Sequence, residues 1–423
     1  MAPVSQLLSL LSIVGTLCTS VSANVLPPRQ AEGHWVSAWT SMPQLVEPNN
    51  LPPSPFKSGS AILNDATLRQ TLYISLSAPR IRLQISNTFG GSDLSITSAS
   101  LALPVGNKAG VKDIIPASLR GLTFNGGASG ITIPRGKTAY TDAINFEVKS
   151  QGMVSLSLYL AKGQSGTSIT GHPGSRTTSW MASGAKVNET SVGGGNTKHW
   201  YFVSAVEAWA PSTTSALVIL GDSITDGRGS TDDGNNRWPD LMLARMAAAG
   251  ITNIGVNNQA AGGNSVLSGG LGPPLLQRYT RDAITQQGVK WIMIFEGVND
   301  IGGGGTDSGS QTRIGDSLIS AFKQIASDAH KAGLLVIGCT ITPFGGNGQG
   351  YSNPEREKTR QRVNKWILNS GGVYDGVVDF DKAVRNEGNV AQLGSQYDGG
   401  DHLHPNVAGY TAMAEAVDLT IFK

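Results

Sequence analysis

Leu217-Val-Ile-Leu-Gly-Asp-Ser223 is the stretch that decides the fold of this chain of 423 residues. Its four apolar residues are typical of a strand buried on both faces, and the glycine after them permits a sharp turn. Apolar runs recur at residues 291–295, 334–341 and 377–380. Amphipathic stretches alternate with these runs, which predicts a parallel sheet covered by helices on both faces. We expect helices over residues 237–249, 310–332, 353–370 and 408–419.

The chain before this stretch has a different pattern. Residues 72–77, 81–86, 101–103 and 154–160 are short runs in which apolar and polar side chains alternate, separated by Gly, Pro, Asn and Ser. Such runs predict an antiparallel β-sandwich. We therefore expect an accessory domain over residues 34–210, a linker at 211–215 and an α/β domain over 216–423.

The first residues have the features of a leader for export. Residues 1–23 contain a short apolar run and end in the small-x-small pattern Val21-Ser-Ala23, which predicts a signal peptide followed by a flexible segment at 24–33. The run is shorter than the roughly 20 apolar residues that span a bilayer. The sequon Asn188-Glu-Thr190 fits a secreted, extracellular glycoprotein.

The cysteines and the net charge limit which roles and partners we expect for this chain. Of the two cysteines, Cys18 lies in the predicted signal peptide, and Cys339 lies in an apolar run where it is expected to be buried. The formal net charge is +2 and there is no Lys/Arg cluster, which argues against a nucleic-acid partner. We expect a monomer with no cofactor, no metal and no membrane span.

Ser223 follows a strand and a tight turn, the position that presents a nucleophile at the carboxyl edge of a parallel sheet. A serine at this position can equally be a helix N-cap. A nucleophilic serine needs a base beside it, so the sequence must also supply one. The chain has six histidines. Only the segment 398–406 of the second half places histidines beside carboxylates outside a helical stretch, and there Asp401 and His404 can pair within one loop.

Four motifs occur in the order typical of the SGNH (GDSL-type) hydrolases, which this chain resembles. They are Gly221-Asp-Ser-Ile-Thr225, Asn258-Gln-Ala-Ala-Gly-Gly263, Gly297-Val-Asn-Asp300 and Asp401-His-Leu-His404. The resemblance implies a three-layer α/β/α, flavodoxin-like parallel sheet. The opening Trp35-Val-Ser-Ala-Trp39 extends the resemblance to a two-domain subgroup of secreted microbial esterases and acylhydrolases, some of them linked with xylan breakdown.

The resemblance also implies a role for each motif residue. Ser223 would be the nucleophile, His404 the general base, and Asp401 the carboxylate that orients the imidazole. The Ser223 N–H, the Gly263 N–H and the Asn299 side-chain amide would form the oxyanion hole. The second motif departs from the family pattern at its third position, so Gly262 remains an alternative to Gly263.

Two further patterns compete with this interpretation. The literal string Gly315-Asp-Ser-Leu318 lies in a segment of helical periodicity with no preceding strand, so Ser317 is expected to be structural. His402 and His404 form a His-x-His pair that could bind a metal together with nearby acids, although a Ser–His–Asp arrangement explains more of the motif residues.

Other residues near the motifs have undecided roles. Asp226 and Asp300 are expected to brace the catalytic turns through hydrogen bonds. Arg228, Arg237 and Trp238 could contact the substrate.

The predicted function is hydrolysis of an O-acyl, chiefly acetyl, ester on a plant-type polysaccharide or other carbohydrate. A small ester is the other expected substrate. The alternatives are a lipase, phospholipase or arylesterase of the same fold, a glycan-cleaving enzyme, and a carbohydrate-binding protein. A glycosidase requires an acid pair across a cleft, for which the sequence offers no spacing argument.

Overall fold

The computed structural model describes residues 32–422, and those from Gly33 onward form one compact unit. The predicted signal peptide at residues 1–23, which includes Cys18, lies outside the described residues, as does most of the predicted segment 24–33. Among the residues described, no helix is long and apolar enough to cross a membrane.

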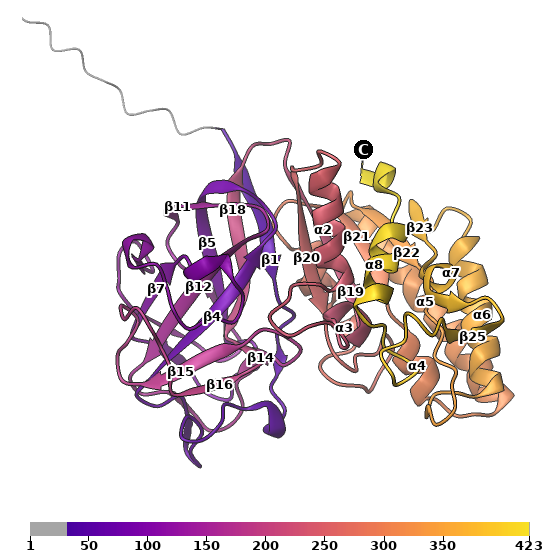
Figure 1. The fold of residues 1–423 in the computed structure, drawn as a ribbon, viewed down its shortest axis with the longest axis horizontal. Helices are drawn as coiled ribbons and strands as arrows, with labels where there is room; N and C mark the ends of the chain where they lie inside the picture. Colours follow the sequence, from indigo (N-terminus) through magenta and orange to yellow (C-terminus); the bar gives the residue numbers. More distant parts are fainter. Residues whose placement is uncertain (1–31, 423) are drawn as a thin grey trace, which may run out of the picture. The chain divides into compact units, whose positions relative to one another are not determined.

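The second half of the chain is built on a five-stranded sheet whose neighbouring strands all run parallel (Figure 1). The apolar run that opened the sequence analysis lies in its second strand, and every residue of that run is buried. The predicted α/β class is thereby confirmed. In spatial order the strands are β20 (Ile254–Ala260), β19 (Ser215–Gly221), β21 (Val289–Phe295), β22 (Leu335–Cys339) and β23 (Gly376–Val378).

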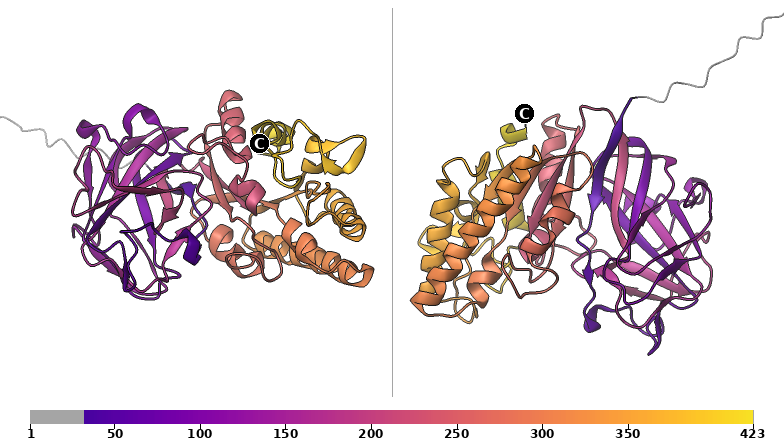
Figure 2. Two further views of the ribbon diagram at one scale, coloured as in Figure 1. Left: turned by 60° about the horizontal axis from the view of Figure 1, so that its bottom comes forward. Right: turned by 180° about the vertical axis from the view of Figure 1, so that it is seen from behind.

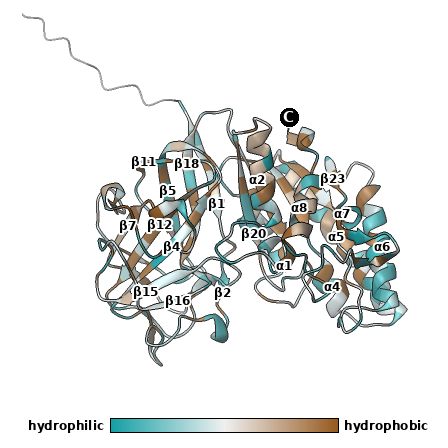
Figure 3. Ribbon diagram, in the orientation of Figure 1, coloured by the Kyte–Doolittle hydropathy of each residue, from teal (hydrophilic) through white to brown (hydrophobic). Residues whose placement is uncertain are grey.

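Helices lie on both faces of this sheet (Figure 2). Helix α2 packs against α8, and α5 packs against α6, so the helices fall into separate groups. Helix α6 carries many charged side chains and is drawn as mainly hydrophilic in Figure 3. The helices that follow strands of the sheet are α2 (Trp238–Ala248), α3 (Leu275–Tyr279), α5 (Ser308–Lys331), α6 (Pro354–Leu368), α7 (Phe380–Val384) and α8 (Val407–Ala416).

The first half of the chain is an antiparallel region, as expected. Its larger sheets share one apolar core. One sheet contains β1 (His34–Thr40), β18 (Val203–Ala210), β5 (Ala78–Ser86), β10 (Thr138–Tyr140) and β11 (Ile144–Val148). The other contains β16 (Gly195–Thr197), β15 (Ser179–Ser183), β4 (Ala66–Ile74), β12 (Gly152–Leu160), β7 (Ser98–Ala102) and β8 (Arg120–Leu122).

The expected strand at residues 72–77 is wrong in its bounds, because β4 begins at Ala66 and ends at Ile74. Both faces of β4 are almost entirely buried, and Gln70 interrupts its apolar face, so a clear alternation of apolar and polar residues marks only the end of this strand. Its buried polar side chains are satisfied internally. Arg69, for example, donates to Ser157 Oγ at 2.9 Å and to the Glu189 carbonyl at 2.7 Å.

Strand β1 joins the antiparallel region to the parallel sheet. The Ser37 N–H donates to the Gln287 carbonyl at 2.9 Å, and Asn257 on β20 donates its side-chain amide to the Ser37 carbonyl at 2.9 Å. A small sheet of β17 (Trp200–Tyr201), β14 (Thr170–His172) and β2 (Gln44–Leu45) belongs to the same region and supplies residues to the cleft described below.

Candidate active site

Ser223 is the first residue of the short helix α1 (Ser223–Asp226), directly after β19. Asp222 caps this helix by accepting the Ile224 N–H at 2.9 Å. A side chain at Gly221 could not fit, because an added Cβ would lie 2.6 Å from Thr225 Oγ1. This tight turn holds the Ser223 hydroxyl at the carboxyl edge of the sheet, where ligands bind in open α/β folds.

The structure brings Ser223, His404 and Asp401 into one hydrogen-bonded chain. Ser223 Oγ lies 2.8 Å from His404 Nε2, and His404 Nδ1 lies 2.7 Å from Asp401 Oδ2. Because a carboxylate oxygen accepts, Nδ1 carries the proton, and the Nε2 lone pair faces the serine hydroxyl. The other oxygen of Asp401 accepts the His404 N–H at 2.8 Å, which fixes the carboxylate in its loop.

The electrostatics suit a neutral imidazole beside an ionised carboxylate. Burial lowers the pKa of His404 below its ordinary value, Asp401 opposes this, and the positive charges of Arg228 and Arg176 lower the pKa further. Burial acts to raise the pKa of Asp401, but hydrogen bonds from the His404 backbone and ring bring it below its usual value. At neutral pH this arrangement leaves His404 able to accept a proton.

Ser223 and Gly263, whose N–H groups are the two backbone donors predicted for the oxyanion hole, both line the cleft. Within the described part of the chain, no acceptor contacts the N–H of Ser223 or of Gly263. Gly263 has a φ of 69°, in the left-handed region that favours glycine. The N–H of Gly262, the alternative, already donates to Asp226 Oδ2 at 2.9 Å. The geometry therefore favours Gly263 over Gly262 as a donor to substrate.

Asn299, the third predicted donor, lies on helix α4 (Val298–Gly303) and lines the same cleft. Its Nδ2 donates to the Asn264 carbonyl at 2.7 Å, and its Oδ1 accepts the Tyr351 hydroxyl at 3.0 Å. An amide nitrogen carries two hydrogens, so one remains for a ligand.

Asp226 and Asp300 brace the motif loops through hydrogen bonds, as expected. Asp300 accepts the N–H groups of Val266 and Leu267 at 2.8 and 2.9 Å. Burial raises the pKa of Asp300 to about 6, while these N–H groups oppose the rise. Asp226 accepts from Gly262 and also from His172, a residue of β14 that the sequence did not indicate.

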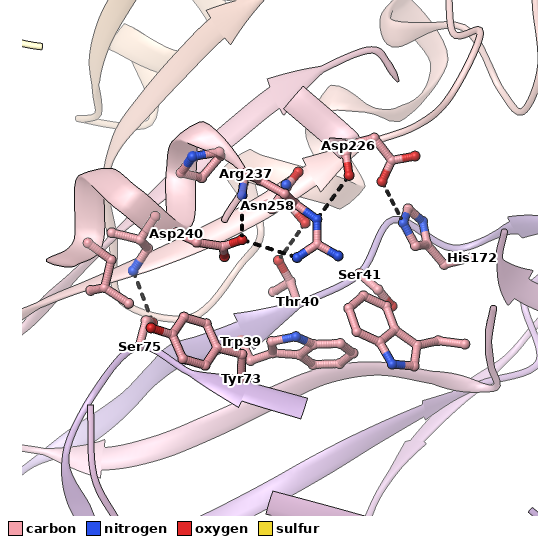
Figure 4. A pocket seen from close by; sticks show the side chains of 14 residues that line it. Trp39, Thr40, Ser41, Tyr73, Ser75, His172, Asp226, Arg237, Asp240 and Asn258 are labelled. Atoms are coloured by element: carbon pink, nitrogen blue, oxygen red, sulfur yellow. Dashed lines mark hydrogen bonds and ion pairs between the residues drawn. The ribbon is translucent and has the colours of Figure 1, made fainter. Parts of the chain in front are cut away.

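His172 connects the antiparallel region to the motif loops (Figure 4). Its Nε2 lies 2.8 Å from Asp226 Oδ1, and its Nδ1 lies 3.0 Å from the Met42 carbonyl. Both ring nitrogens face oxygen atoms, so the ring is held from both sides. The cavity beside this pair has a volume of only about 40 Å³, too small for a substrate.

The substrate contacts considered for Arg237 and Trp238 are wrong. Both side chains are buried away from the cleft. Arg237 donates to the carbonyl groups of Asp226 and Ser175 and pairs with Asp240, as Figure 4 shows in part. Because the buried Arg237 guanidinium donates to backbone carbonyl groups, it cannot bind substrate.

Arg278 is a second functional residue absent from the predictions. It is fully buried and donates to the carbonyl groups of Gly221 and Gln259 at 3.1 and 2.6 Å. It also contacts Asn264 Oδ1 at 2.9 Å and the Glu296 carboxyl at 3.2 Å. Arg278 thus ties together the ends of β19, β20 and β21. Its spacing of three residues from the buried Leu275 was a signal that it faces the core.

The remaining motif residues have separate partners. His402 bonds Asp398 at 2.5 Å and does not line the cleft, so its ring and that of His404 serve different carboxylates. Among residues 32–422, no group of His, Cys, Asp and Glu side chains is placed to hold a metal ion. Ser317 lies exposed on α5, in the helical context expected for it.

The cleft around Ser223 has a volume of about 970 Å³ and is formed by both halves of the chain. Arg228 lies in it with 69% of its side chain exposed, 3.9 Å from the Asp401 carboxylate. The antiparallel region contributes Gln44, Glu47, Asn50, Pro173, Gly174 and Arg176 to its lining.

The family model described as GDSL-like Lipase/Acylhydrolase matches residues 219–412. No match was found among curated proteins. Similar solved structures include a GDSL-like lipase from Bacteroides thetaiotaomicron, at 18% identity over 49% of this chain and 88% of that chain, with a TM-score of 0.37.

Two more are similar over 48% of this chain. A variant of an acetyl xylan esterase from Geobacillus stearothermophilus has 25% identity, 94% coverage of its own chain and a TM-score of 0.37. A lipase/acylhydrolase from Enterococcus faecalis has 20% identity, 93% coverage and a TM-score of 0.35. With the family match spanning all the motif loops, this chain contains a GDSL-like lipase/acylhydrolase domain at residues 219–412 and is an ester hydrolase.

Proposed function

We propose that Ser223 is the nucleophile of a serine esterase and that His404 and Asp401 complete its catalytic triad. The observation that carries this proposal is the continuous hydrogen-bonded chain from Ser223 Oγ through the His404 ring to Asp401. As Ser223 Oγ attacks the ester carbonyl carbon, its proton passes to His404 Nε2. The N–H groups of Ser223 and Gly263 and the amide of Asn299 stabilise the resulting oxyanion.

The second half of the reaction uses the same groups. His404 gives its proton to the departing alcohol oxygen as the carbon–oxygen bond breaks, which leaves an acyl ester on Ser223. Water then attacks this acyl ester, and His404 accepts a proton from the water. The oxyanion collapses, the carboxylic acid leaves, and the proton returns to Ser223 Oγ. Asp401 stabilises the imidazolium in both steps without taking the proton.

The proposed substrate is an acetyl ester of a carbohydrate, with plant-type polysaccharides as the first class to test. The cleft is wide and lined mainly by polar side chains and glycines, which suits a hydroxyl-rich alcohol. Its apolar side chains are few, and they include Leu271 and Leu403. Because few large apolar side chains line the cleft, the lipase alternative has less support.

Chain-length profiling tests this assignment. Acetyl, butyryl and octanoyl esters of 4-nitrophenol are compared with acetylated xylan, using the wild type, Ser223→Ala and the control Ser317→Ala. We expect acetyl esters to be best and Ser223→Ala to lose about 10⁴-fold or more of kcat. A preference for the octanoyl ester over the acetyl ester would instead assign a lipase. Full activity of Ser223→Ala would overturn the triad.

The arrangement of the chain supports a two-domain division. We infer that residues 34–210 form a β-sandwich accessory domain and residues 216–423 a three-layer, flavodoxin-like catalytic domain. The antiparallel sheets with their shared core, and the parallel strand order with helices on both faces, support this division.

We propose that this enzyme is secreted. The side chain of Asn188 is exposed, so the sequon is accessible to a glycosyltransferase. Intact-mass measurement of enzyme from a eukaryotic secretory host, before and after an N-glycosidase, tests the modification. An unchanged mass would exclude glycosylation at Asn188.

A further inference from the structure

Tyr351 contacts the proposed oxyanion donor but belongs to none of the sequence motifs. It lies in the segment 342–353, between β22 and α6, and it lines the cleft around Ser223. Its hydroxyl is 3.0 Å from Asn299 Oδ1. The nucleophile and this tyrosine therefore share one cleft, with Asn299 bonded to the tyrosine.

The hydrogen bonds on both sides of Asn299 fix the orientation of its amide. The Asn264 carbonyl, 2.7 Å from the amide nitrogen, can only accept, so the NH₂ group must face it. The oxygen of the amide then faces Tyr351, and the phenol must be the donor. With Asn264 and Tyr351 at opposite ends, the amide cannot flip, and its second hydrogen keeps one direction.

Packing contacts hold the Tyr351 ring in the position that its hydrogen bond to Asn299 requires. Phe344, which is buried, packs edge-on against the ring at a centroid distance of 6.3 Å and an interplanar angle of 86°. Gly302 also lies against this ring, and any Cβ added there would overlap it. Burial, followed by the negative charge of Asp222, raises the pKa of Tyr351, so the hydroxyl keeps its proton at alkaline pH.

The segment that carries Tyr351 also contacts the loop of Asp401. Gln349 Oε1 accepts the Tyr351 N–H at 3.0 Å, and Gln349 Nε2 donates to the Asp401 carbonyl at 2.5 Å. One short segment thus contacts the proposed oxyanion donor on one side and the loop of the catalytic carboxylate on the other.

We propose that Tyr351 is a positioning residue that acts through Asn299 and aims its amide at the oxyanion. This inference rests on the proposed role of Asn299. A hydrogen bond donated to an amide oxygen also polarises the amide, which makes its N–H a better donor. The oxyanion exists only in the transition state and the tetrahedral intermediate, so the effect falls on kcat and leaves KM nearly unchanged.

A double-mutant cycle on the full-length enzyme tests the proposal, with 4-nitrophenyl acetate as substrate. We expect Asn299→Ala to lower kcat by about 10²-fold or more. Tyr351→Phe keeps the ring and is expected to lower kcat about tenfold with KM within about twofold. In the Asn299→Ala background, Tyr351→Phe should change kcat by less than about twofold, because the amide it orients is gone.

The other possible results of the double-mutant cycle would each contradict a stated role. Equal losses from Tyr351→Phe in both backgrounds would show that the hydroxyl acts on substrate directly, and no loss in either would show that it is idle. Both results overturn the inference while leaving Asn299 in place. If Asn299→Ala keeps full kcat, the proposed oxyanion hole itself fails.

Two controls keep the cycle interpretable. Tyr279→Phe removes a hydroxyl that bonds Asp328 at 2.8 Å outside the cleft, and it should leave kcat unchanged. If Asn299→Ala fails to fold, Asn299→Ser supplies the second background, since its side chain is too short to reach Tyr351. Thermal unfolding of every variant shows which are folded.

Discussion

His404 can act as a base only while its ring is neutral, so the pH dependence of activity is decided at one residue. The Nδ1–H of its ring donates to Asp401, which leaves the Nε2 lone pair facing Ser223. Burial and the nearby arginines lower the pKa of the ring, while Asp401 raises it in part. The enzyme should therefore gain activity as pH rises through a value below the ordinary histidine range.

We predict that the acid limb of kcat/KM lies below pH 6.5, the ordinary value for histidine. Arg228 contributes a positive charge that disfavours protonation, so Arg228→Gln should move this limb to higher pH. The shift should shrink in high salt, because the Arg228 side chain is mostly exposed. Rate profiles from pH 4 to 9 on a neutral acetyl ester measure both effects. An unmoved limb, or one that moves to lower pH, would contradict the electrostatic account.

Single residues differ in how far the sequence could predict them. Ser223, Asp401 and His404 were predicted from short motifs that are recognisable locally, and the structure brings their side chains together. Tyr351 and His172 were missed because their roles depend on contacts to Asn299 and Asp226, more than 50 positions away along the chain.

At the scale of elements, the site depends on keeping the ends of three parallel strands in register. Arg278 does this from inside the core, through carbonyl groups on β19 and β20 and the carboxyl of Glu296 beyond β21. Burial raises the pKa of Glu296 to about 8, although Arg278 opposes the rise. Asp282, at 3.4 Å, is a second carboxylate partner of Arg278.

Replacing Arg278 should therefore loosen the motif loops together. We predict that Arg278→Met lowers the free energy of unfolding by about 3 kcal/mol, because buried acceptors lose their donor. The control Arg313→Met removes a surface arginine of α5 and should change this free energy by less than about 0.5 kcal/mol. Urea unfolding curves measure both. Equal stability of the two variants would show that Arg278 does not organise the strand ends.

The elements themselves were predictable to different degrees. Four of the parallel strands and the four expected helices followed from apolar runs and helical periodicity, with observed bounds close to the expected ones. Strand β20 was not predicted, because its sequence ends in Asn257-Asn-Gln-Ala260 and has no continuous apolar run. The start of β4 was missed because Gln70 interrupts the run of apolar residues on one of its faces. Alternation detects a strand only where apolar and polar residues alternate without a break.

For the molecule as a whole, the two halves of the chain contribute to one site. The antiparallel region lines part of the cleft and holds Asp226 through His172, and Asp226 in turn holds the Gly262 N–H beside Gly263. This joint construction explains why a fragment of either half would lack part of the site. No local pattern in the sequence indicates it, because the contact appears only when the halves are packed together.

Removing His172 should thus impair catalysis as well as stability. His172→Ala leaves a buried carboxylate without its partner, and we predict a loss of about 3 kcal/mol in unfolding free energy. Without His172, Asp226 holds the turn at Gly262 and Gly263 less firmly, which should lower kcat about tenfold. His34→Ala is the matched control, since His34 of the antiparallel region bonds the Thr214 carbonyl of the segment 211–215 at 2.9 Å, outside the cleft. If both variants retain full kcat, the antiparallel region does not act on the oxyanion hole.

The central claim, that Ser223 is the nucleophile, is tested most directly by covalent labelling. A fluorophosphonate reacts with an activated serine, and peptide mass spectrometry locates the adduct. We predict one adduct, on Ser223, formed in step with the loss of esterase activity, and no adduct on Ser317 or in Ser223→Ala. Inactivation with the adduct on another residue, or an active enzyme that never labels, would contradict the account.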